Sequence, residues 1–279
     1  MICETVPAED AKSNSRSSTA IYVLGITPAI DDAPSKLTSE FIDDIQAIRR
    51  GSLTTWQGTV KTSEFCRVEG EANLANIQWV APRAIDHERL VRAIHDRTTI
   101  CPARFATLFQ DDQLLDRQIE SYQSELNQFF ASCQFKDEWS VVVNLDRAKA
   151  IENYRQQDRS RETSSTASTG RSYLASRRRN LFDDAQWQST LKAALSDVQA
   201  TLATIADRLV LQRPIQESAP ANQLERVASF TLLVDRHAIQ QLEAFASHWT
   251  QEFGNRQGIH LALSGPWPLF TFSCEFAFK

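Results

Sequence analysis

The sequence predicts an α+β protein with two domains, each a mainly antiparallel sheet with helices on one face. From residue 20 onward, short runs of β-forming residues alternate with amphipathic helical stretches. After residue 138 the predicted order is strand, helices, strand, helix, strand, strand. The length of 279 residues is sufficient for two ordinary domains.

The N-terminal domain, residues 20–135, begins with a strand predicted over 21–26, an apolar run rich in β-forming residues. An acidic loop and a short helix follow. The apolar side of that helix consists of Phe41, Ile45 and Ile48. Two further strands are expected near 53–68 and 74–81, and Pro82 should end the second, because proline cannot donate to a sheet.

Two helices complete this domain. Asp86 is suited to cap the first helix. Asp111 and Asp112 stand at the beginning of the second, where their negative charges interact favourably with the helix dipole. The first helix carries Leu90, Val91 and Ile94. In the second, apolar residues recur at spacings of four and three, which is the periodicity of one buried stripe. The residues of this stripe are Leu115, Ile119, Tyr122, Leu126 and Phe129.

The C-terminal domain, residues 136–279, is predicted to begin with a strand whose apolar residues alternate with others. These apolar residues are Trp139, Val141, Val143 and Leu145. An apolar stripe from Trp187 to Leu209 predicts a long helix. Strands are predicted at 227–234 and 259–263, with a helix capped by Asp235 between them.

Three further segments have their own character. Residues 1–19 are polar and are expected to form a disordered tail, and residues 155–169 a flexible loop within the C-terminal domain. The final segment, 270–278, alternates with a period of two and predicts an aromatic strand. One side of this strand would carry Phe270, Phe272, Cys274, Phe276 and Phe278.

Composition and charge restrict the function. A formal net charge of -5 argues against a broad attraction to nucleic acid or anionic lipid. No stretch approaches the ~20 apolar residues that span a bilayer, and the polar N-terminus is not a secretory signal. We therefore expect a cytoplasmic protein. An odd number of widely spaced cysteines is typical of reduced thiols. They are Cys3, Cys66, Cys101, Cys133 and Cys274.

No pattern predicts a catalytic, cofactor or metal site. The eight glycines form no phosphate-binding motif, and the Asp pairs fit helix caps or solvated faces. His237 and His248 would share a helix face about 16 Å apart, too far for one metal ion. We interpret the histidines as surface or capping residues. They are His87, His95, His237, His248 and His260.

Two arginine features allow more than one interpretation. The basic run at 177–179 suits a solvated helix face with Asp183 as a partner, and a contact with an acidic partner or nucleic acid is the alternative. Arg104 lies in an apolar run, where a buried guanidinium needs partners. We expect it to be a buried anchor between the two halves, with a binding role open.

Five segments carry a resemblance to a known family. They are IYVLGI at 21–26, ICPARFATLF at 100–109, EWSVVV at 138–143, GRSYLASR at 170–177 and LSGPWPLFTF at 263–272. In this order they resemble the gas vesicle GvpL/GvpF family, whose second segment reads Pro-x-Arg-Phe-Gly-Thr. Ala103 and Ala106 stand where the family usually has Leu and Gly, and Leu269-Phe270 where it has Pro-Tyr.

The resemblance implies a minor, non-enzymatic gas vesicle component with two α+β domains like ferredoxin-like units. It also implies binding to the aggregation-prone major shell protein and to accessory proteins during nucleation, in the cytoplasm and on the vesicle, without a cofactor. The expected protein-binding residues are Arg104, Phe105, Trp267, Phe270, Phe272 and Phe276.

A helper of this kind would offer an apolar groove or a free strand edge. The C-terminal aromatic strand is one candidate support for such a surface, and the alternative is that its phenylalanines belong to the core. Two rival functions stay open. One is an enzyme with a site around Asp86, His87 and Arg104, and the other is an RNA binder using sheet aromatics.

Overall fold

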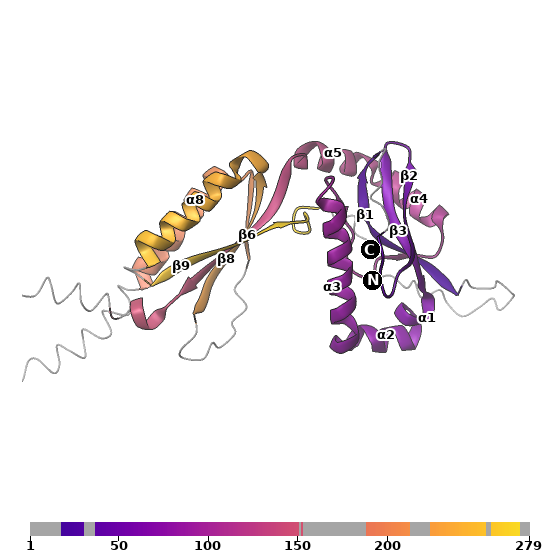
Figure 1. Ribbon diagram of the computed structural model, residues 1–279, viewed down its shortest axis with the longest axis horizontal. Helices are drawn as coiled ribbons and strands as arrows, with labels where there is room; N and C mark the ends of the chain where they lie inside the picture. The colour runs from indigo at the N-terminus through magenta and orange to yellow at the C-terminus, as the bar shows by residue number, and fades with distance from the viewer. Residues whose placement is uncertain are drawn as a thin grey trace, which may run out of the picture. The chain divides into compact units, whose positions relative to one another are not determined.

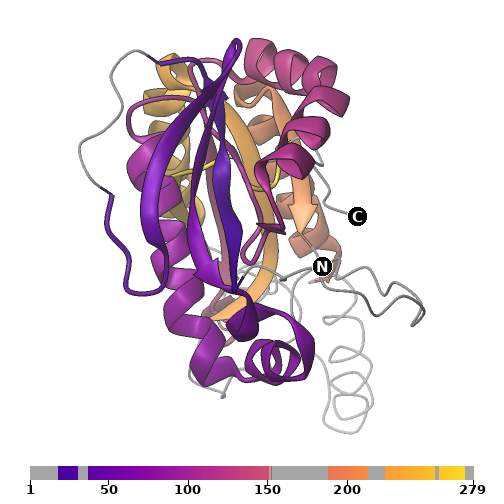
Figure 2. The same ribbon diagram turned by 90° about the vertical axis from the view of Figure 1, so that its right-hand side faces the viewer.

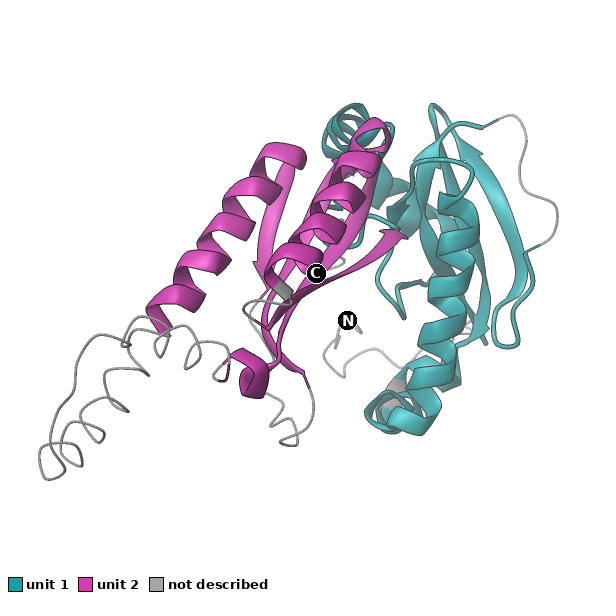
Figure 3. Ribbon diagram, turned by 60° about the vertical axis from the view of Figure 1, so that its left-hand side comes forward, with its two compact units in different colours: residues 1–136, 267–279 teal, residues 137–266 magenta. Residues whose placement is uncertain are grey.

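The structure is a computed structural model that describes residues 18–30, 37–150, 152, 188–212, 224–254 and 258–273. The chain divides into two compact units, residues 1–136 with 267–279 and residues 137–266 (Figure 3). Both units combine helices with a sheet, which confirms the α+β class. Within the described residues, no helix is both long and apolar enough to span a membrane.

The sheet of the first unit has five strands, with the order β2-β3-β1-β4 and with β5 also paired to β1. Figure 2 shows the three longest of them, β1, β2 and β3, side by side. The strands are β1 (Thr19–Pro28), β2 (Asp43–Arg50), β3 (Leu53–Lys61), β4 (Cys101–Pro102) and β5 (Leu108–Phe109). All the pairings of β1 and β3 in this sheet are antiparallel. The predicted first strand is confirmed and extends beyond 21–26.

Helices lie on both faces of this sheet (Figure 1). They are α1 (Thr62–Phe65), α2 (Arg67–Ala75), α3 (Ile77–His95), α4 (Asp112–Ser121) and α5 (Gln123–Cys133). The buried side of α3 packs against Tyr22, Leu24 and Trp56. Thr55 and Gln57 alternate with Trp56 along β3 and therefore face the opposite side, where they connect to α4.

The predicted helix with Phe41, Ile45 and Ile48 is wrong, because residues 43–50 form strand β2. Arg50 pairs with Leu53 across a two-residue turn at Gly51-Ser52. Gly51 has φ 64°, the left-handed conformation that a tight hairpin requires. The hairpin thus overrides the helix-like spacing of the apolar residues.

The strand predicted over 74–81 is also wrong. Helix α3 begins at Ile77, where the Asn76 side chain accepts a hydrogen bond from the Gln78 amide at 3.0 Å. Pro82 lies inside this helix and removes one backbone hydrogen bond near its beginning. Asp86 is consequently an interior residue of α3 and not its cap.

The acidic start of the next helix is confirmed, since Asp111 caps α4 by accepting from the Leu114 amide at 2.8 Å. The predicted single stripe is divided between α4 and α5, with a break at Tyr122. Four of the five stripe residues are buried, namely Leu115, Ile119, Leu126 and Phe129.

The sheet of the second unit has four strands in the order β7-β8-β6-β9. They are β6 (Lys136–Leu145), β7 (Arg208–Gln212), β8 (Glu225–Asp235) and β9 (Ile259–Trp267). The described part of the first helix covers residues 188–205, and α8 (Ile239–Trp249) lies between β8 and β9. The elements of this unit follow the order strand, helix, strand, strand, helix, strand, and the first and third strands are central in the sheet. This is the ferredoxin-like arrangement.

The core of this unit forms between the sheet and the two helices (Figure 1). The alternation predicted for β6 is confirmed, because Trp139, Val141, Val143 and Leu145 are buried. They pack in one cluster with Val198 and Leu202 of the first helix and Leu242 and Ala246 of α8. Asp235 accepts from the His237 amide at 2.8 Å and begins the turn before α8, as predicted.

Two predictions for this half are corrected. The helix predicted to reach Leu209 ends at 205, and Leu209 belongs to strand β7. The aromatic strand predicted over 270–278 is wrong for its described residues, because 269–273 form a turn. The predicted tail up to residue 17, the 155–169 loop, the basic run at 177–179 and Trp187 lie outside the described residues.

Candidate functional site

The segment from Ala103 to Thr107 is a loop between β4 and β5 that is tied to β1 at both ends. The Ala103 amide donates to the Leu24 carbonyl at 3.0 Å. The Val23 amide donates to the Thr107 carbonyl, also at 3.0 Å. These two bonds fix where the loop begins and ends. Within the loop, the Thr107 amide donates to the Arg104 carbonyl at 3.2 Å and closes a turn. Side chains from β1 and α3 add further contacts to this turn.

A buried pair of side chains, Tyr22 of β1 and His87 of α3, holds the middle of the loop. Tyr22 Oη lies 2.9 Å from His87 Nδ1, and His87 Nε2 lies 3.1 Å from the Ala103 carbonyl oxygen. The Ala106 amide donates to Tyr22 Oη at 3.2 Å. The two side chains therefore connect both sides of the loop through one chain of hydrogen bonds.

The hydrogens of this chain follow from its ends. A carbonyl oxygen can only accept, so His87 Nε2 carries the hydrogen directed at Ala103. The Tyr22 oxygen accepts from the Ala106 amide and directs its own hydrogen to His87 Nδ1. Every donor then has an acceptor only when His87 is neutral.

Burial favours the same protonation states. It lowers the pKa of His87 to about 4, against the smaller opposite effects of the Ala103 carbonyl and the Asp86 charge. Burial also raises the pKa of Tyr22, so its hydroxyl keeps its hydrogen. The pair is a neutral structural support, and it has no mobile proton near neutral pH.

Ala106 has a φ of 63°, in the left-handed region that glycine occupies without strain. This conformation directs its amide at Tyr22. An alanine here therefore carries a backbone cost that glycine would not carry.

Arg104 is exposed, which corrects the prediction that its guanidinium is buried. Its neighbour Phe105 is half-buried, with ring centroids 6.1 Å from His87 and 6.5 Å from Tyr22. Consecutive residues thus have opposite roles. Phe105 anchors the loop in an aromatic cluster, and Arg104 is presented to solvent.

The same cluster continues to α3 and α1. Phe65 lies 6.4 Å from Phe105 and 5.2 Å from Trp79 between ring centroids. The Arg83 guanidinium stacks 4.1 Å from the Trp79 ring and contacts Glu64 at 3.6 Å. The loop therefore rests on a continuous set of packed rings.

The C-terminal residues expected to bind partners are placed differently from one another. Trp267 is half-buried, with the Arg92 guanidinium 5.2 Å from its ring centre. Phe270 is 38% exposed and Phe272 only 3% exposed, so these two do not share a face. Phe276 lies outside the described residues.

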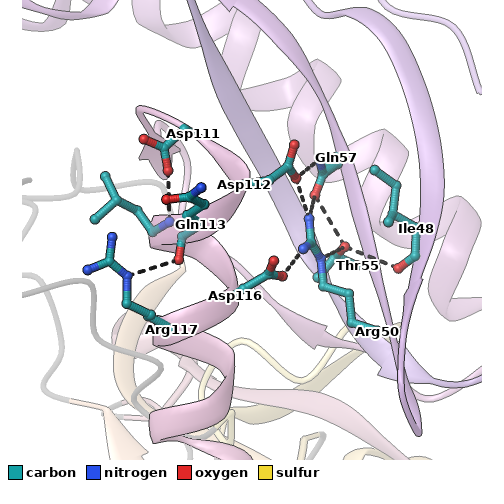
Figure 4. Close-up of polar contacts among 10 residues, drawn as sticks. Ile48, Arg50, Thr55, Gln57, Asp111, Asp112, Gln113, Asp116 and Arg117 are labelled. Atoms are coloured by element: carbon teal, nitrogen blue, oxygen red, sulfur yellow. Dashed lines mark hydrogen bonds and ion pairs between the residues drawn. The ribbon is translucent and has the colours of Figure 1, made fainter.

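Arg50 forms a polar cluster that no sequence pattern indicated (Figure 4). Its guanidinium bonds Asp112 at 2.5 Å and also bonds Asp116, both on α4. It also donates to Thr55 at 2.9 Å and to Gln57 at 3.1 Å. The hydrogen bond from Arg50 holds the pKa of Asp112 below its usual range. The cluster fastens the β2–β3 hairpin to α4.

The residues proposed for an enzyme site do not assemble into one. Asp86 accepts from Ser39 at 2.6 Å and from Arg89 at 2.9 Å. Both nitrogens of His87 are occupied by Tyr22 and the loop, and Arg104 is exposed. Among the residues placed by the structure, no three His, Cys, Asp or Glu side chains gather as a metal site would require.

The surface interpretation of the histidines is wrong for two of them. His87 and His95 are buried on α3. They fall at the three- and four-residue spacings that connect Leu90, Val91 and Ile94, so the buried stripe already contained them. That spacing was the signal that could have identified His87 and His95 as buried residues.

Known proteins resemble this chain along most of its length. The sequence model of the family described as "Gas vesicle synthesis protein GvpL/GvpF" matches residues 20–273. "Gas vesicle protein L" of Streptomyces sp. (strain CB03234) is 25% identical over 229 residues, which cover 81% of this chain and 82% of that protein.

Two crystal structures of the gas vesicle protein GvpF share the fold. The protein from Anabaena sp. PCC7120 has a TM-score of 0.62 at 15% identity, over 92% of this chain and 99% of that one. The protein from Microcystis aeruginosa has a TM-score of 0.58 at 14% identity, over 91% and 99%.

Proposed function

The chain belongs to the GvpL/GvpF family of gas vesicle synthesis proteins, and we propose that it is a minor vesicle component that binds other vesicle proteins. Its partners in this proposal are the major shell protein and further accessory proteins. By binding them it limits their aggregation and helps to nucleate the vesicle. The observation that carries the proposal is a family match that includes residues of both units.

The physical need for such a protein is clear. A shell protein that lines a gas space has an apolar face, and an apolar face in water aggregates. A binding partner in the cytoplasm can cover that face until assembly begins. We propose that the chain acts by surface contacts alone, without catalysis, first in the cytoplasm and then on the growing vesicle.

We propose the 103–107 loop as one of these contacts. Arg104 is exposed on a loop that Tyr22, His87 and Phe105 hold in one conformation. A side chain displayed on a rigid support loses little conformational entropy when it binds. Arginine is also enriched among the residues that contribute most to protein interfaces. Phe272 is buried and supports the core in this proposal, while Trp267 and Phe270 have exposed surface for contact.

The proposal is tested in cells that lack the endogenous copy of the gene. The wild-type chain should restore flotation and intact vesicles, and it should co-purify with the shell protein. Arg104→Glu should reduce both, because charge reversal leaves the fold intact and changes the displayed contact. Arg97→Glu is the matched control, since Arg97 is also exposed in the same unit.

Two results would contradict the proposal. Normal flotation without the chain would exclude a role in assembly. Wild-type chain that recovers no vesicle protein from a floating strain would exclude a binding role.

A further inference from the structure

Strand β7 (Arg208–Gln212) is an edge of the sheet in the second unit. It pairs with β8 from Arg208↔Leu233 to Gln212↔Ser229 without a register shift. In the part of the chain that the structure describes, no strand pairs with its other side. On an edge strand, the backbone groups of alternate residues face outward and can pair with a further strand.

The side chains of β7 suit such an addition. Leu211 is 54% exposed, and Val210 is exposed on the opposite face of the sheet. Leu209 shares the face of Leu211 and is packed against the core. An added strand would therefore place its alternate side chains beside Leu209 and Leu211.

The other sheet edges carry features that oppose strand addition. β2 has a register shift between Asp43 and Gln46, and Asp44 has a φ of 50° there. β9 contains Pro266. β4 and β5 have only two residues each. Bulges, charges, proline and short length are the usual protections of edges, and residues 209–211 have neither charge, proline nor bulge.

We propose that β7 is a docking edge for an extended apolar segment of a partner protein, which joins the sheet as an additional strand. Main-chain hydrogen bonds supply affinity in this mode, and the alternate side chains supply specificity. The inference rests on the proposed function and names the chemistry of one partner contact. The corresponding probe is the major shell protein of the same vesicle system.

A second copy of this chain is a poorer occupant of the edge. A stable interface covers about 800 Å² on each partner, and two short strands alone cover much less. The five residues of β7 are all that this edge itself offers to a second copy. An apolar segment in water gains in addition the burial of its own side chains.

The test combines a substitution with hydrogen exchange on the full chain. The probe is purified shell protein kept soluble by fusion to a carrier. Leu211→Lys adds an edge charge and should weaken capture of the probe by about tenfold or more. Ile77→Lys is the matched control, because Ile77 is 73% exposed and lies on α3 of the first unit. It should bind like wild type.

Hydrogen exchange tests the pairing itself. Outward-facing amides within 208–212 should exchange at least about tenfold more slowly when the probe is bound, since a new strand accepts their hydrogen bonds. Equal capture by Leu211→Lys and wild type, with unchanged exchange in β7, would overturn the docking edge and leave the proposed function standing.

Two further outcomes would also contradict the docking edge. If wild type captures no probe, the proposed function and the docking edge fall together. If the wild-type chain is a dimer, and Leu211→Lys makes it a monomer without changing capture of the probe, a second copy occupies the edge. The proposed occupant would then be wrong.

Discussion

Tyr22 Oη and His87 Nδ1 lie 2.9 Å apart, although 65 positions separate the two residues in the sequence. Through this contact, strand β1 and helix α3 together hold the Ala103 carbonyl and the Ala106 amide. The orientation of the exposed Arg104 therefore depends on two buried side chains.

Protonation of His87 should destabilise the protein in acid. The pKa of His87 is about 4 in the folded chain and ordinarily 6.5, so between these values the unfolded chain binds the proton and the folded chain does not. This contribution to stability is complete above pH 6.5 and decreases as the pH falls toward 4, by about 3 kcal/mol in total. Urea unfolding at pH 7.5 and pH 5 measures it. The His87→Gln variant should show a smaller loss between these pH values, and an equal loss would contradict the assignment.

Removing the Tyr22 hydroxyl should cost about 1–3 kcal/mol, because Tyr22→Phe leaves the Ala106 amide and His87 Nδ1 without their partner in a buried site. Chemical denaturation gives the size of the loss, and amide exchange at Ala106 should accelerate. A double-mutant cycle with His87→Phe provides the control. Additive losses would show that the two side chains do not act as a unit.

Ala106→Gly should stabilise the protein by about 1 kcal/mol, because glycine adopts the left-handed φ of 63° without a clash of its side chain. Ala103→Gly, in the same loop, should have the opposite effect on stability. Ala103 is buried and its φ is not positive, so glycine there should reduce stability. Thermal unfolding of both variants distinguishes a backbone effect from general loosening of the loop.

Phe135→Gly should also be stabilising, by about 1 kcal/mol. Phe135 has a φ of 62° and follows Gln134, the C-cap residue of α5, at a position where glycine is common. Its side chain is 58% exposed. The substitution relieves the backbone and removes few buried contacts. A lower melting temperature would show that the ring stabilises the fold despite its exposure.

Arg50→Lys should cost about 2 kcal/mol. Lysine keeps the charge, but its one nitrogen has three donors and lacks the planar fork with which Arg50 reaches four partners. Arg50 has only 12% of its side chain exposed, which limits compensation by water. The neighbouring Arg49→Lys is the control. Arg49 is exposed, and its substitution should change the free energy of unfolding by less than about 0.5 kcal/mol.

The sequence predicted the fold where one local signal determines burial. Alternation identified β6, because Val141 and Val143 face the core of the second unit. Local patterns failed where a turn or a helix cap determined the type of secondary structure. Gly51 forms the hairpin that makes 43–50 a strand, and Asn76 begins a helix that continues through Pro82.

The candidate site was harder to predict, because it depends on contacts between residues far apart in the sequence. Arg104 was expected to be buried since its sequence neighbours are apolar, but the loop directs Phe105 inward and leaves Arg104 outside. The Tyr22–His87 contact has no local signature at all. Only the spacing of His87 on the buried stripe of α3 indicated that this histidine was internal.

The first unit contains residues 267–273 as well as the N-terminal half, with Leu269 and Phe272 buried and Trp267 against Arg92. During translation, residues 137–266 leave the ribosome before this segment does. The second unit can thus fold as it emerges, while the first waits for its closing residues although its strands were made earlier. Shortened chains that end before residue 267 would keep the second unit's sequence whole and leave the first without its last buried side chains.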